Sequence, residues 1–305
     1  MGRQPRAQQP RRSKKIMTDL DLARRYYAEE LRAAANLQSE ALVRAFAKVP
    51  REHFLGPGPW QVFTPYSESD WTTKDADPKQ LYHNLLVAID AERRLNNGYP
   101  SFLAFLIEQL ELTEGDHVVH IGCGPGYYTA VMAEVVGPAG QVTAMEIDSQ
   151  LARRAQSNLS YLPQVKIMEG DGGEEDPGPC DAILVNAGAT HPRSIWLDSL
   201  RAGGRLILPL TAADDEGGTA GEVFKVTRED TGFVAAFVSR VGIFPCAGAR
   251  DPALNDKLKE AFKRGDAKSV QSLRRYRHEA EDSCWFHGEG FCLSKVAMAD
   301  RKFDK

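Results

Sequence analysis

Apolar residues recur with a helical period near the start of the chain. Between positions 18 and 49 they return every three or four residues, which predicts two amphipathic helices. Asp19 or Asp21 is expected to cap the first helix, and the second is expected to begin after Ser39. Residues 55–80 are rich in aromatic residues, glycine and proline without a clear period, and they predict an irregular loop.

The pattern changes near residue 116 to short apolar runs that alternate with helical segments. This alternation is typical of a parallel sheet covered by helices on both faces, so the predicted fold class is α/β, doubly wound and mostly parallel. Strands are predicted at 118–122, 141–147, 165–170, 182–187 and 205–210, with helices at 129–136, 151–159 and 194–200.

The chain beyond residue 210 has a different pattern. Two antiparallel strands are predicted at 222–227 and 232–241, followed by charged helices at 254–263 and 267–278. The resulting division is a disordered basic tail at 1–16, an N-terminal helical cap region at 17–115, an α/β core at 116–212, and C-terminal strands and helices at 213–305 that complete the sheet and the substrate side.

Charge and cysteine content narrow the possible functions. The formal net charge of −4 argues against nucleic acid as a partner, because such proteins need a basic face. Residues 1–16 contain basic side chains and no acid, and they are too polar to fold alone. Five widely spaced cysteines without a secretory signal indicate a reducing compartment, so we expect the cytoplasm. The sequence contains no apolar run of about 18 residues, so we expect no segment that spans a membrane.

The strongest chemical signal follows the first predicted core strand. A dinucleotide site requires G-x-G-x-x-G, whose last glycine falls where this chain has Tyr127. The glycines instead follow the spacing G-x-G-x-G that is typical of S-adenosylmethionine-dependent methyltransferases. We therefore expect S-adenosyl-L-methionine as cofactor. The residues expected to bind it in this loop are Gly122, Cys123, Gly124, Gly126 and Tyr127.

Two acids at the ends of the next predicted strands extend this site. Glu146, followed by Ile147, is placed to accept hydrogen bonds from ribose hydroxyls, and Asp171, followed by Gly172, is placed to accept one from the adenine amino group. For either acid alone, an ordinary helix cap at the strand end is the favoured interpretation. Their order after the glycine loop favours a cofactor site at the carboxyl edge of the sheet.

Four segments resemble motifs of the protein L-isoaspartate O-methyltransferases. They are V-P-R-E-H-F at 49–54, I-G-C-G-P-G-Y at 121–127, G-D-G at 170–172 and G-G-R-L-I-L-P at 203–209. The resemblance runs from about residue 40 to about residue 212. It implies a seven-stranded methyltransferase sheet, S-adenosylmethionine as donor, and a carboxylate of an isoaspartyl protein or peptide as the methyl acceptor.

The chain departs from this family at two places. The family carries Thr-Ile-Ser-x-Pro before the glycine loop, and alignment on Pro100 places Gly98 at the serine position, after Asn96 and Asn97. His120 replaces the usual acid two residues before the first glycine. A small molecule or another protein side chain therefore stays open as the acceptor. A non-catalytic, cofactor-binding adaptor that uses a charged helix at 269–281 is a third alternative.

A carboxylate acceptor needs positioning more than acid–base catalysis. It is already ionised at neutral pH, since its pKa is about 4, so no general base is required. Asn97, Gly98 and Asn186 are the candidate catalytic residues, through substrate positioning. Asn186 is equally consistent with a turn residue that bonds its own backbone. Arg250 is a further candidate for gripping a carboxylate, although a surface ion pair with Asp251 or Glu52 is the favoured interpretation.

The C-terminal region holds a group of metal-ligand residue types. Cys284, His287 and Cys292 are close in sequence, but three soft ligands do not complete a zinc site. Trp285 and Phe286 lie between them and indicate a buried strand. We therefore predict no metal. His120, inside an apolar strand, is interpreted as a structural histidine that satisfies a neighbouring carbonyl.

Overall fold

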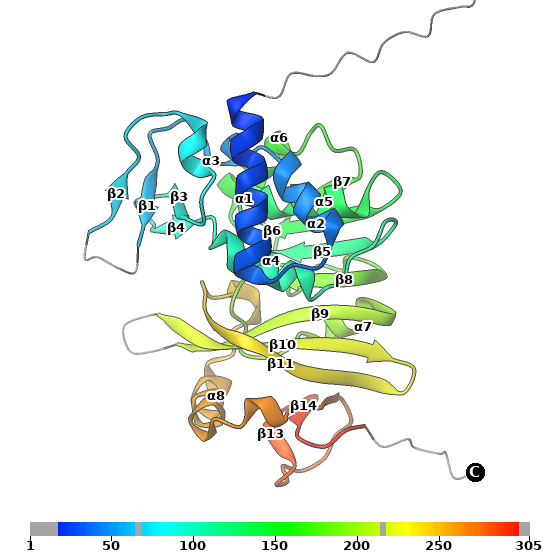
Figure 1. Ribbon diagram of the computed structural model, residues 1–305. Helices are drawn as coiled ribbons and strands as arrows, with labels where there is room; N and C mark the ends of the chain where they lie inside the picture. Colours follow the sequence, from blue (N-terminus) through cyan, green and yellow to red (C-terminus); the bar gives the residue numbers. More distant parts are fainter. Residues whose placement is uncertain (1–17, 65–68, 214–217, 299–305) are drawn as a thin grey trace, which may run out of the picture.

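The computed structural model describes residues 18–64, 69–213 and 218–298. The basic tail predicted at 1–16 lies outside these residues. Within the described ranges, no helix combines the length and the apolar composition that a membrane crossing requires. Figure 1 shows the helices of the N-terminal half packed on one part of a long twisted sheet, whose last strands lie at the other end of the molecule.

The chain begins with the two predicted helices, α1 (Asp19–Ala35) and α2 (Glu40–Lys48). The cap of α1 is Thr18 and not an aspartate, because the Thr18 hydroxyl accepts from the Asp21 amide while the Asp21 carboxylate accepts from the Thr18 amide. This reciprocal pair satisfies two donors at the helix start. Ser39 caps α2 as expected.

The segment predicted as an irregular loop at 55–80 instead contains β1 and β2, which belong to a small antiparallel sheet in the order β2-β1-β3-β4. A separate apolar cluster packs Val87 of β3 with Trp60 and Leu81, which lie next to the strands in the sequence. Short strands paired with distant partners leave no local period, which is why the sequence pattern missed them. The elements are α3 (Glu52–Leu55), β1 (Gln61–Phe63), β2 (Trp71–Thr72), η1 (Pro78–Leu81), β3 (Leu86–Asp90) and β4 (Leu95–Asn96).

The α/β core confirms the predicted doubly wound sheet. Its strands run parallel in the order β9-β8-β5-β6-β7, with crossover helices between them. The helices are α4 (Pro100–Glu108), α5 (Tyr127–Val136), α6 (Ser149–Asn158) and α7 (Ser194–Ser199), and the strands are β5 (His117–Ile121), β6 (Gln141–Glu146), β7 (Val165–Glu169), β8 (Cys180–Val185) and β9 (Leu200–Ala213).

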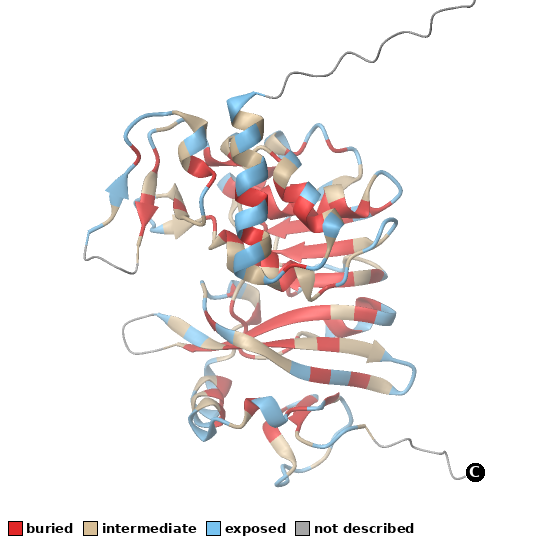
Figure 2. Ribbon diagram, viewed as in Figure 1, coloured by how far each residue is buried: buried red, intermediate tan, exposed pale blue. Residues whose placement is uncertain are grey.

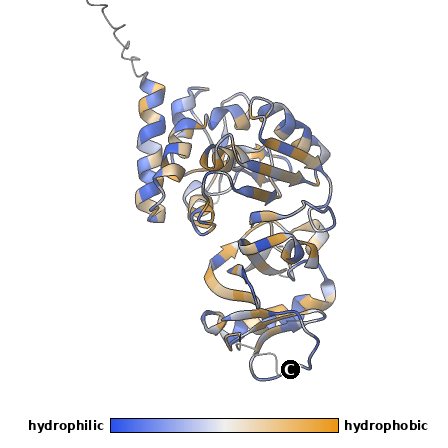
Figure 3. Ribbon diagram, turned by 90° about the vertical axis from the view of Figure 1, so that its right-hand side faces the viewer, coloured by the Kyte–Doolittle hydropathy of each residue, from blue (hydrophilic) through white to orange (hydrophobic). Residues whose placement is uncertain are grey.

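Alternate residues of these strands belong to two separate cores, one on each face of the sheet. Val118 packs with α1, α2, α4 and α5, whereas Val119 packs with the residues of α7 and α8. Burial on both faces explains the continuous apolar runs of the sequence. Figure 2 shows the buried residues gathered along the central strands, and Figure 3 shows the same strands as hydrophobic segments between more hydrophilic helices.

Antiparallel strands continue the sheet beyond β9. Strands β10 and β11 bring the sheet to the seven strands that the family resemblance implies, and β12, β14 and β13 extend it to ten. The elements after β9 are β10 (Thr219–Glu229), β11 (Gly232–Gly242), η2 (Ala247–Ala249), α8 (Pro252–Arg264), η3 (Ala267–Ser269), β12 (Ser272–Arg274), β13 (Cys284–Gly288) and β14 (Phe291–Ser294).

The prediction of a charged helix at 267–278 is wrong. Ser272 and Leu273 are buried in β12, which pairs with both β11 and β14, so the ladder hydrogen bonds of two neighbours replace helical ones. The segment from 275 to 282 is mostly exposed and is not helical. The structure therefore does not contain the helix at 269–281 through which a non-catalytic adaptor was expected to bind a partner.

Arg51 joins the N-terminal helices to the small sheet. Its side chain is fully buried, and its guanidinium donates to the carbonyls of Leu81 at 2.7 Å, His83 at 3.0 Å and Leu85 at 2.7 Å. Its neighbour Glu52 pairs with Arg24. The V-P-R-E segment therefore stabilises the fold beside the site and does not line it.

Replacement of Arg51 by methionine tests this connection. Three buried carbonyls lose a charged donor in Arg51→Met, so we expect a loss of about 3 kcal/mol in the free energy of unfolding. Urea denaturation measures the change. The exposed Arg44 on α2 provides the control, and Arg44→Met is expected to change stability by less than about 0.5 kcal/mol. Equal effects of the two substitutions would contradict the assignment.

Candidate active site

The glycine loop links β5 to α5 with three left-handed backbone positions. Gly122, Gly124 and Gly126 have φ of 76°, 55° and 97°, a region that other residues rarely adopt. A Cβ on Gly126 would lie 2.5 Å from Leu159 Cδ1, so this glycine also allows α5 to pack closely against the end of α6. The loop therefore turns tightly at the carboxyl end of the sheet.

Glu146, at the end of β6, is held in place by two backbone amides. Its Oε2 accepts from the Gly124 amide at 2.8 Å, and its Oε1 accepts from the Asp148 amide at 3.1 Å. The side chain is largely buried, yet each carboxylate oxygen has a further acceptor position. Arg93 forms an ion pair with Asp148, and this hydrogen-bonded guanidinium lowers the pKa of the Asp148 carboxyl.

Asp171 follows β7 and lies against a second loop. Its Oδ1 accepts from the Gly173 amide at 2.8 Å. A Cβ on Gly248 would fall 1.7 Å from the same oxygen, so the backbone at Gly248 approaches the carboxylate in a way that only glycine permits. The chain between β11 and α8 thus packs directly over the third strand end.

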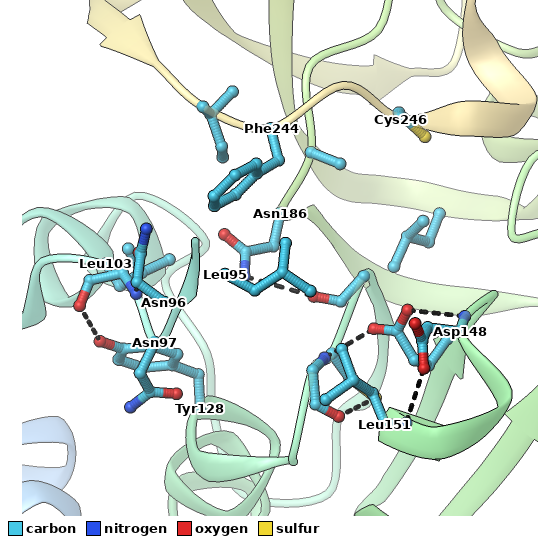
Figure 4. Close-up of a pocket in the computed structure, with 18 of the residues that line it drawn as sticks. Leu95, Asn96, Asn97, Leu103, Tyr128, Asp148, Leu151, Asn186, Phe244 and Cys246 are labelled. Atoms are coloured by element: carbon cyan, nitrogen blue, oxygen red, sulfur yellow. Dashed lines mark hydrogen bonds between the residues drawn. The ribbon is translucent and has the colours of Figure 1, made fainter. Parts of the chain in front are cut away.

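These strand ends border one cavity of about 670 Å³, a size typical of a small-molecule site. Glu146, Asp148 and Asp171 belong to one part of its wall, and Asn96, Asn97 and Leu103 lie on another, as Figure 4 shows for the labelled residues. Predicted site residues in the lining are Asn97, Gly98, Gly122, Cys123, Gly124, Glu146, Ile147, Asp171, Gly172 and Asn186.

Two predicted cofactor residues do not reach this cavity. The Tyr127 side chain is fully buried in the N-terminal core, where its hydroxyl lies 3.4 Å from that of Tyr27. Its neighbour Tyr128 lines the cavity instead, because successive helical residues point about 100° apart. Gly126 is likewise absent from the wall, and a Cβ at this position would meet Leu159 and Ala155 of the neighbouring helix end.

Arg250 also lies outside the cavity wall. Its Nη1 donates to the Thr211 carbonyl at 2.6 Å and to the Gly188 carbonyl at 3.3 Å, so it ties the loop after β8 to β9. Both interpretations of its sequence position are wrong, since its hydrogen bonds go to backbone carbonyls and to the Asn255 side chain and not to Asp251 or Glu52. Tertiary packing alone selected these partners.

Asn186 lies in the cavity between Leu95 and Phe244 in the view of Figure 4. Its amide Nδ2 donates to the Gly122 carbonyl at 3.3 Å, across from β8 to the glycine loop. The predicted turn interaction with its own backbone is therefore replaced by a bond that holds the side chain at the sheet edge. That Asn186 positions the methyl acceptor stays a prediction.

The segment before α4 forms a polar part of the wall. The Gly98 amide donates to Asn96 Oδ1, and the Gly98 carbonyl accepts from the Tyr128 hydroxyl at 3.3 Å. Asn97 Nδ2 is buried without a hydrogen-bond partner among the described residues. Ser101 Oγ accepts from Asn84 Nδ2 at 2.8 Å. An unpaired buried amide next to a cavity suggests a donor that awaits a ligand.

His120 packs beneath the glycine loop. It is fully buried, and its Nδ1 lies 2.9 Å from Thr129 Oγ1, so its partner is a hydroxyl and not the predicted carbonyl. Burial lowers the pKa of His120 to about 3. The imidazole is therefore neutral at physiological pH, and a proton there would lack solvation.

Residues after β11 complete the cavity and were missed by sequence reasoning. Ile243, Phe244 and Pro245 line the wall, as does the exposed Arg240 near the end of the strand. The run G-I-F-P-C-A-G contains glycine and proline signals for a loop, but its position over Asp171 is set by long-range strand pairing.

A doubly wound sheet with a G-x-G-x-G loop and acids at the next two strand ends defines the class of S-adenosylmethionine-dependent methyltransferases. Residues 24–235 match the family model of protein-L-isoaspartate(D-aspartate) O-methyltransferase. The chain belongs to this family, and it is an enzyme whose methyl donor is S-adenosyl-L-methionine.

Individual relatives agree with this assignment. Protein-L-isoaspartate O-methyltransferase 1 of Archaeoglobus fulgidus is 35% identical over 200 residues, which are 63% of this chain and 81% of the relative. The Ignicoccus hospitalis enzyme is 29% identical over 230 residues, which are 73% of this chain and 96% of the relative.

Solved structures share the fold. A protein-L-isoaspartate O-methyltransferase has a TM-score of 0.60 at 24% identity, over 83% of this chain and 72% of its own. A structure from Plasmodium falciparum, described as a β-aspartate methyltransferase in complex with S-adenosyl-L-homocysteine, has a TM-score of 0.55 at 17% identity, over 73% of this chain and 97% of its own.

The buried His120 predicts an acid-sensitive fold. Its folded pKa lies below the unfolded value of about 6.5, so the unfolded state takes up a proton first and stability falls as the pH drops below that value. Between about pH 7.5 and about pH 5, wild type should lose about 2 kcal/mol more than His120→Asn. Urea denaturation at both pH values measures this difference, with the exposed His83→Asn as control. A pH dependence unchanged by His120→Asn would refute it.

Proposed function

We propose that this enzyme methylates the side-chain carboxylate of an isoaspartyl residue in a protein or peptide. The observation that carries the proposal is the distribution of charge in the cavity wall. Among the residues that the structure describes, the acids of the lining, Glu146, Asp148 and Asp171, cluster near the glycine loop, and Arg240 is the one other charged residue. A wall without carboxylates suits an anionic acceptor, and the named relatives are methyltransferases of isoaspartyl proteins.

The acidic part of the cavity is assigned to the donor. Glu146 keeps acceptor positions for ribose hydroxyls after bonding the two backbone amides. Asp171 is assigned to the adenine amino group, and Gly122 and Gly124 allow the backbone to approach the ligand. Ile147 is 53% exposed and lines the cavity, so it offers an apolar surface for the adenine ring.

The reaction requires orientation and no proton transfer. When bound, S-adenosylmethionine supplies an electrophilic methyl group on a sulfonium. A carboxylate oxygen of the acceptor forms a bond to this carbon, and the electrons of the broken C–S bond go to sulfur. The products are a methyl ester and a neutral thioether. The side chains of the cavity therefore have to hold the acceptor oxygen about 3 Å from the methyl carbon, in line with the bond that breaks.

The acceptor is assigned to the polar wall formed by Asn97, Ser101 and Asn186. Asn97 lines this wall, and its amide nitrogen is buried and without a partner among the described residues. Asn186 is already oriented by its bond to Gly122. Arg240 is exposed, and we assign it to attracting the negative substrate into the cavity.

The cavity wall still contains a hydroxyl group, although Gly98 stands where the family has a serine. Gly98 has φ of 72°, and a Cβ there would lie 2.8 Å from Leu103 Cδ2, so a serine at this position would be strained and crowded. Ser101 places a hydroxyl in the same wall three residues later. We assign to Ser101 the donor role of the absent serine.

The cytoplasmic location belongs to the same proposal. All five cysteines are free thiols, and four of them are buried. Free thiols persist in a reducing compartment, which supports this assignment.

Removal of the Glu146 charge tests the donor site. We expect Glu146→Gln to weaken S-adenosylhomocysteine binding by roughly 10- to 100-fold, because hydrogen bonds to a charged group contribute about 1.5–3 kcal/mol. Isothermal titration calorimetry measures the affinity. Glu169 pairs with Glu146 in register on β7 but is exposed and outside the cavity, so Glu169→Gln is the matched control. Unchanged affinity in Glu146→Gln would exclude the assigned role.

Labelled donor and matched peptides test the acceptor. An isoaspartyl peptide should receive the methyl group, while its aspartyl twin should not. In Arg240→Gln the KM for the isoaspartyl peptide should rise roughly two- to fivefold at low salt, with little change in kcat, because an exposed charge contributes modestly. The exposed Arg153 on α6 lies outside the cavity wall, and Arg153→Gln serves as control. Label that appears only on small molecules of a cell extract would overturn the proposed substrate.

A further inference from the structure

Four metal-ligand side chains meet at the far end of the sheet from the cofactor edge. His278, Cys284, His287 and Cys292 each offer a ligand atom, and these four atoms all lie within 4.8 Å of one another. The sequence pattern indicated only three of them, because His278 falls in the segment 267–278 that was predicted to be a helix. The group lies beyond residue 235, where the family model ends.

A β-bulge brings the two strand residues of β13 to one face. Side chains three apart on a regular strand point to opposite faces, which would separate Cys284 from His287. In this hairpin, Cys284 pairs with Ser294 and His287 pairs with Cys292, while the register shifts at Trp285. Since Cys292 and Ser294 are two apart on β14, their partners Cys284 and His287 share the face of Cys292.

The loop between β12 and β13 supplies the fourth ligand. His278 Nε2 lies 3.5 Å from Cys284 Sγ, and its Nδ1 lies 3.0 Å from the Tyr276 carbonyl. A proton on Nδ1 donates to that carbonyl and leaves the Nε2 lone pair directed toward the cluster. Metal-binding histidines are typically oriented in this way by their second ring nitrogen.

The spacing of the group fits a tetrahedral ion. Zinc–sulfur bonds of about 2.3 Å and zinc–nitrogen bonds of about 2.0 Å place neighbouring sulfur and nitrogen ligands roughly 3.5 Å apart. Cys284 Sγ lies 3.5 Å from His278 Nε2 and 4.0 Å from His287 Nδ1. Two thiolates and two imidazoles are the donor set of structural zinc sites, whereas calcium and magnesium select oxygen ligands.

We propose that His278, Cys284, His287 and Cys292 bind one zinc ion that attaches the loop at 275–283 to the β13–β14 hairpin. Four protein ligands leave no open coordination position, so the site is structural and takes no part in methyl transfer. Binding converts the two thiols to thiolates and releases two protons. Most of the loop is exposed and has little apolar contact of its own, so the metal supplies the attachment that packing does not.

Metal analysis of the purified full-length chain tests the proposal. Mass spectrometry of the metal content should find close to one zinc per chain in wild type. His278 is half-buried and lies on a loop, so we expect His278→Ala to fold. The zinc affinity of this variant should fall by more than the roughly 10- to 100-fold that is lost when a hydrogen-bond partner of a metal ligand is removed. The exposed His83→Ala is the matched control and should retain the metal.

Cobalt substitution distinguishes this site from adventitious binding. Co²⁺ in the proposed site should give the intense visible bands of tetrahedral coordination and a thiolate charge-transfer band, and both should weaken in Cys292→Ser, which keeps only one of the two thiolates. A chelator should lower the Tm of wild type but not that of His278→Ala. The proposal would be overturned if the wild-type chain contained no zinc or if His278→Ala left the zinc content unchanged. A disulfide between Cys284 and Cys292 in the purified protein would also overturn it.

Donor binding separates this proposal from the proposed function. None of the four ligand residues lines the cofactor cavity, so S-adenosylhomocysteine affinity should be unchanged in His278→Ala. The proposed zinc site and the proposed methyl acceptor can therefore be refuted independently of each other, because each is tested by its own measurement.

Discussion

The hydrogen bond from the Gly124 amide to the Glu146 carboxylate fixes the relation between the two strand ends on which the site depends. It joins the turn after β5 to the tip of β6 at 2.8 Å, and the Asp148 amide holds the second oxygen of the same carboxylate. Parallel pairing of β5 with β6 brings these groups to one edge of the sheet. The central sheet therefore serves the site by aligning strand ends.

Two peripheral parts of the chain close the cavity around that edge. On one side, Arg51 bonds three carbonyls that precede β3, and residues between Leu86 and Leu103 contribute to the wall. On the other, the loop after β11 packs its Gly248 backbone against Asp171. The acidic strand ends and the part of the wall without carboxylates thus come from different regions, which allows one cavity to hold partners of opposite electrostatic character.

Local sequence signals identified the core of the site, and they failed where distant contacts decide the structure. The glycine spacing and the acids at 146 and 171 depend on short-range geometry, and the structure brings them to one cavity. The side chain of Tyr127 lies in the core and that of Tyr128 lines the cavity, and only the packing of α5 shows which of the two tyrosines faces the cavity. Arg250 was assigned to ligands or surface acids, although its partners are carbonyls of two separate segments.

By itself, the sequence determined the doubly wound core and the strand ends that border the cavity, because strand periodicity and left-handed glycines are properties of neighbouring residues. Only the tertiary structure decided the small N-terminal sheet, the strand at β12 and the meeting of His278 with the cysteines of the last hairpin. Those features depend on pairing between segments far apart in the chain and on a single bulge at Trp285. Such contacts leave no repeating pattern in the residues that form them.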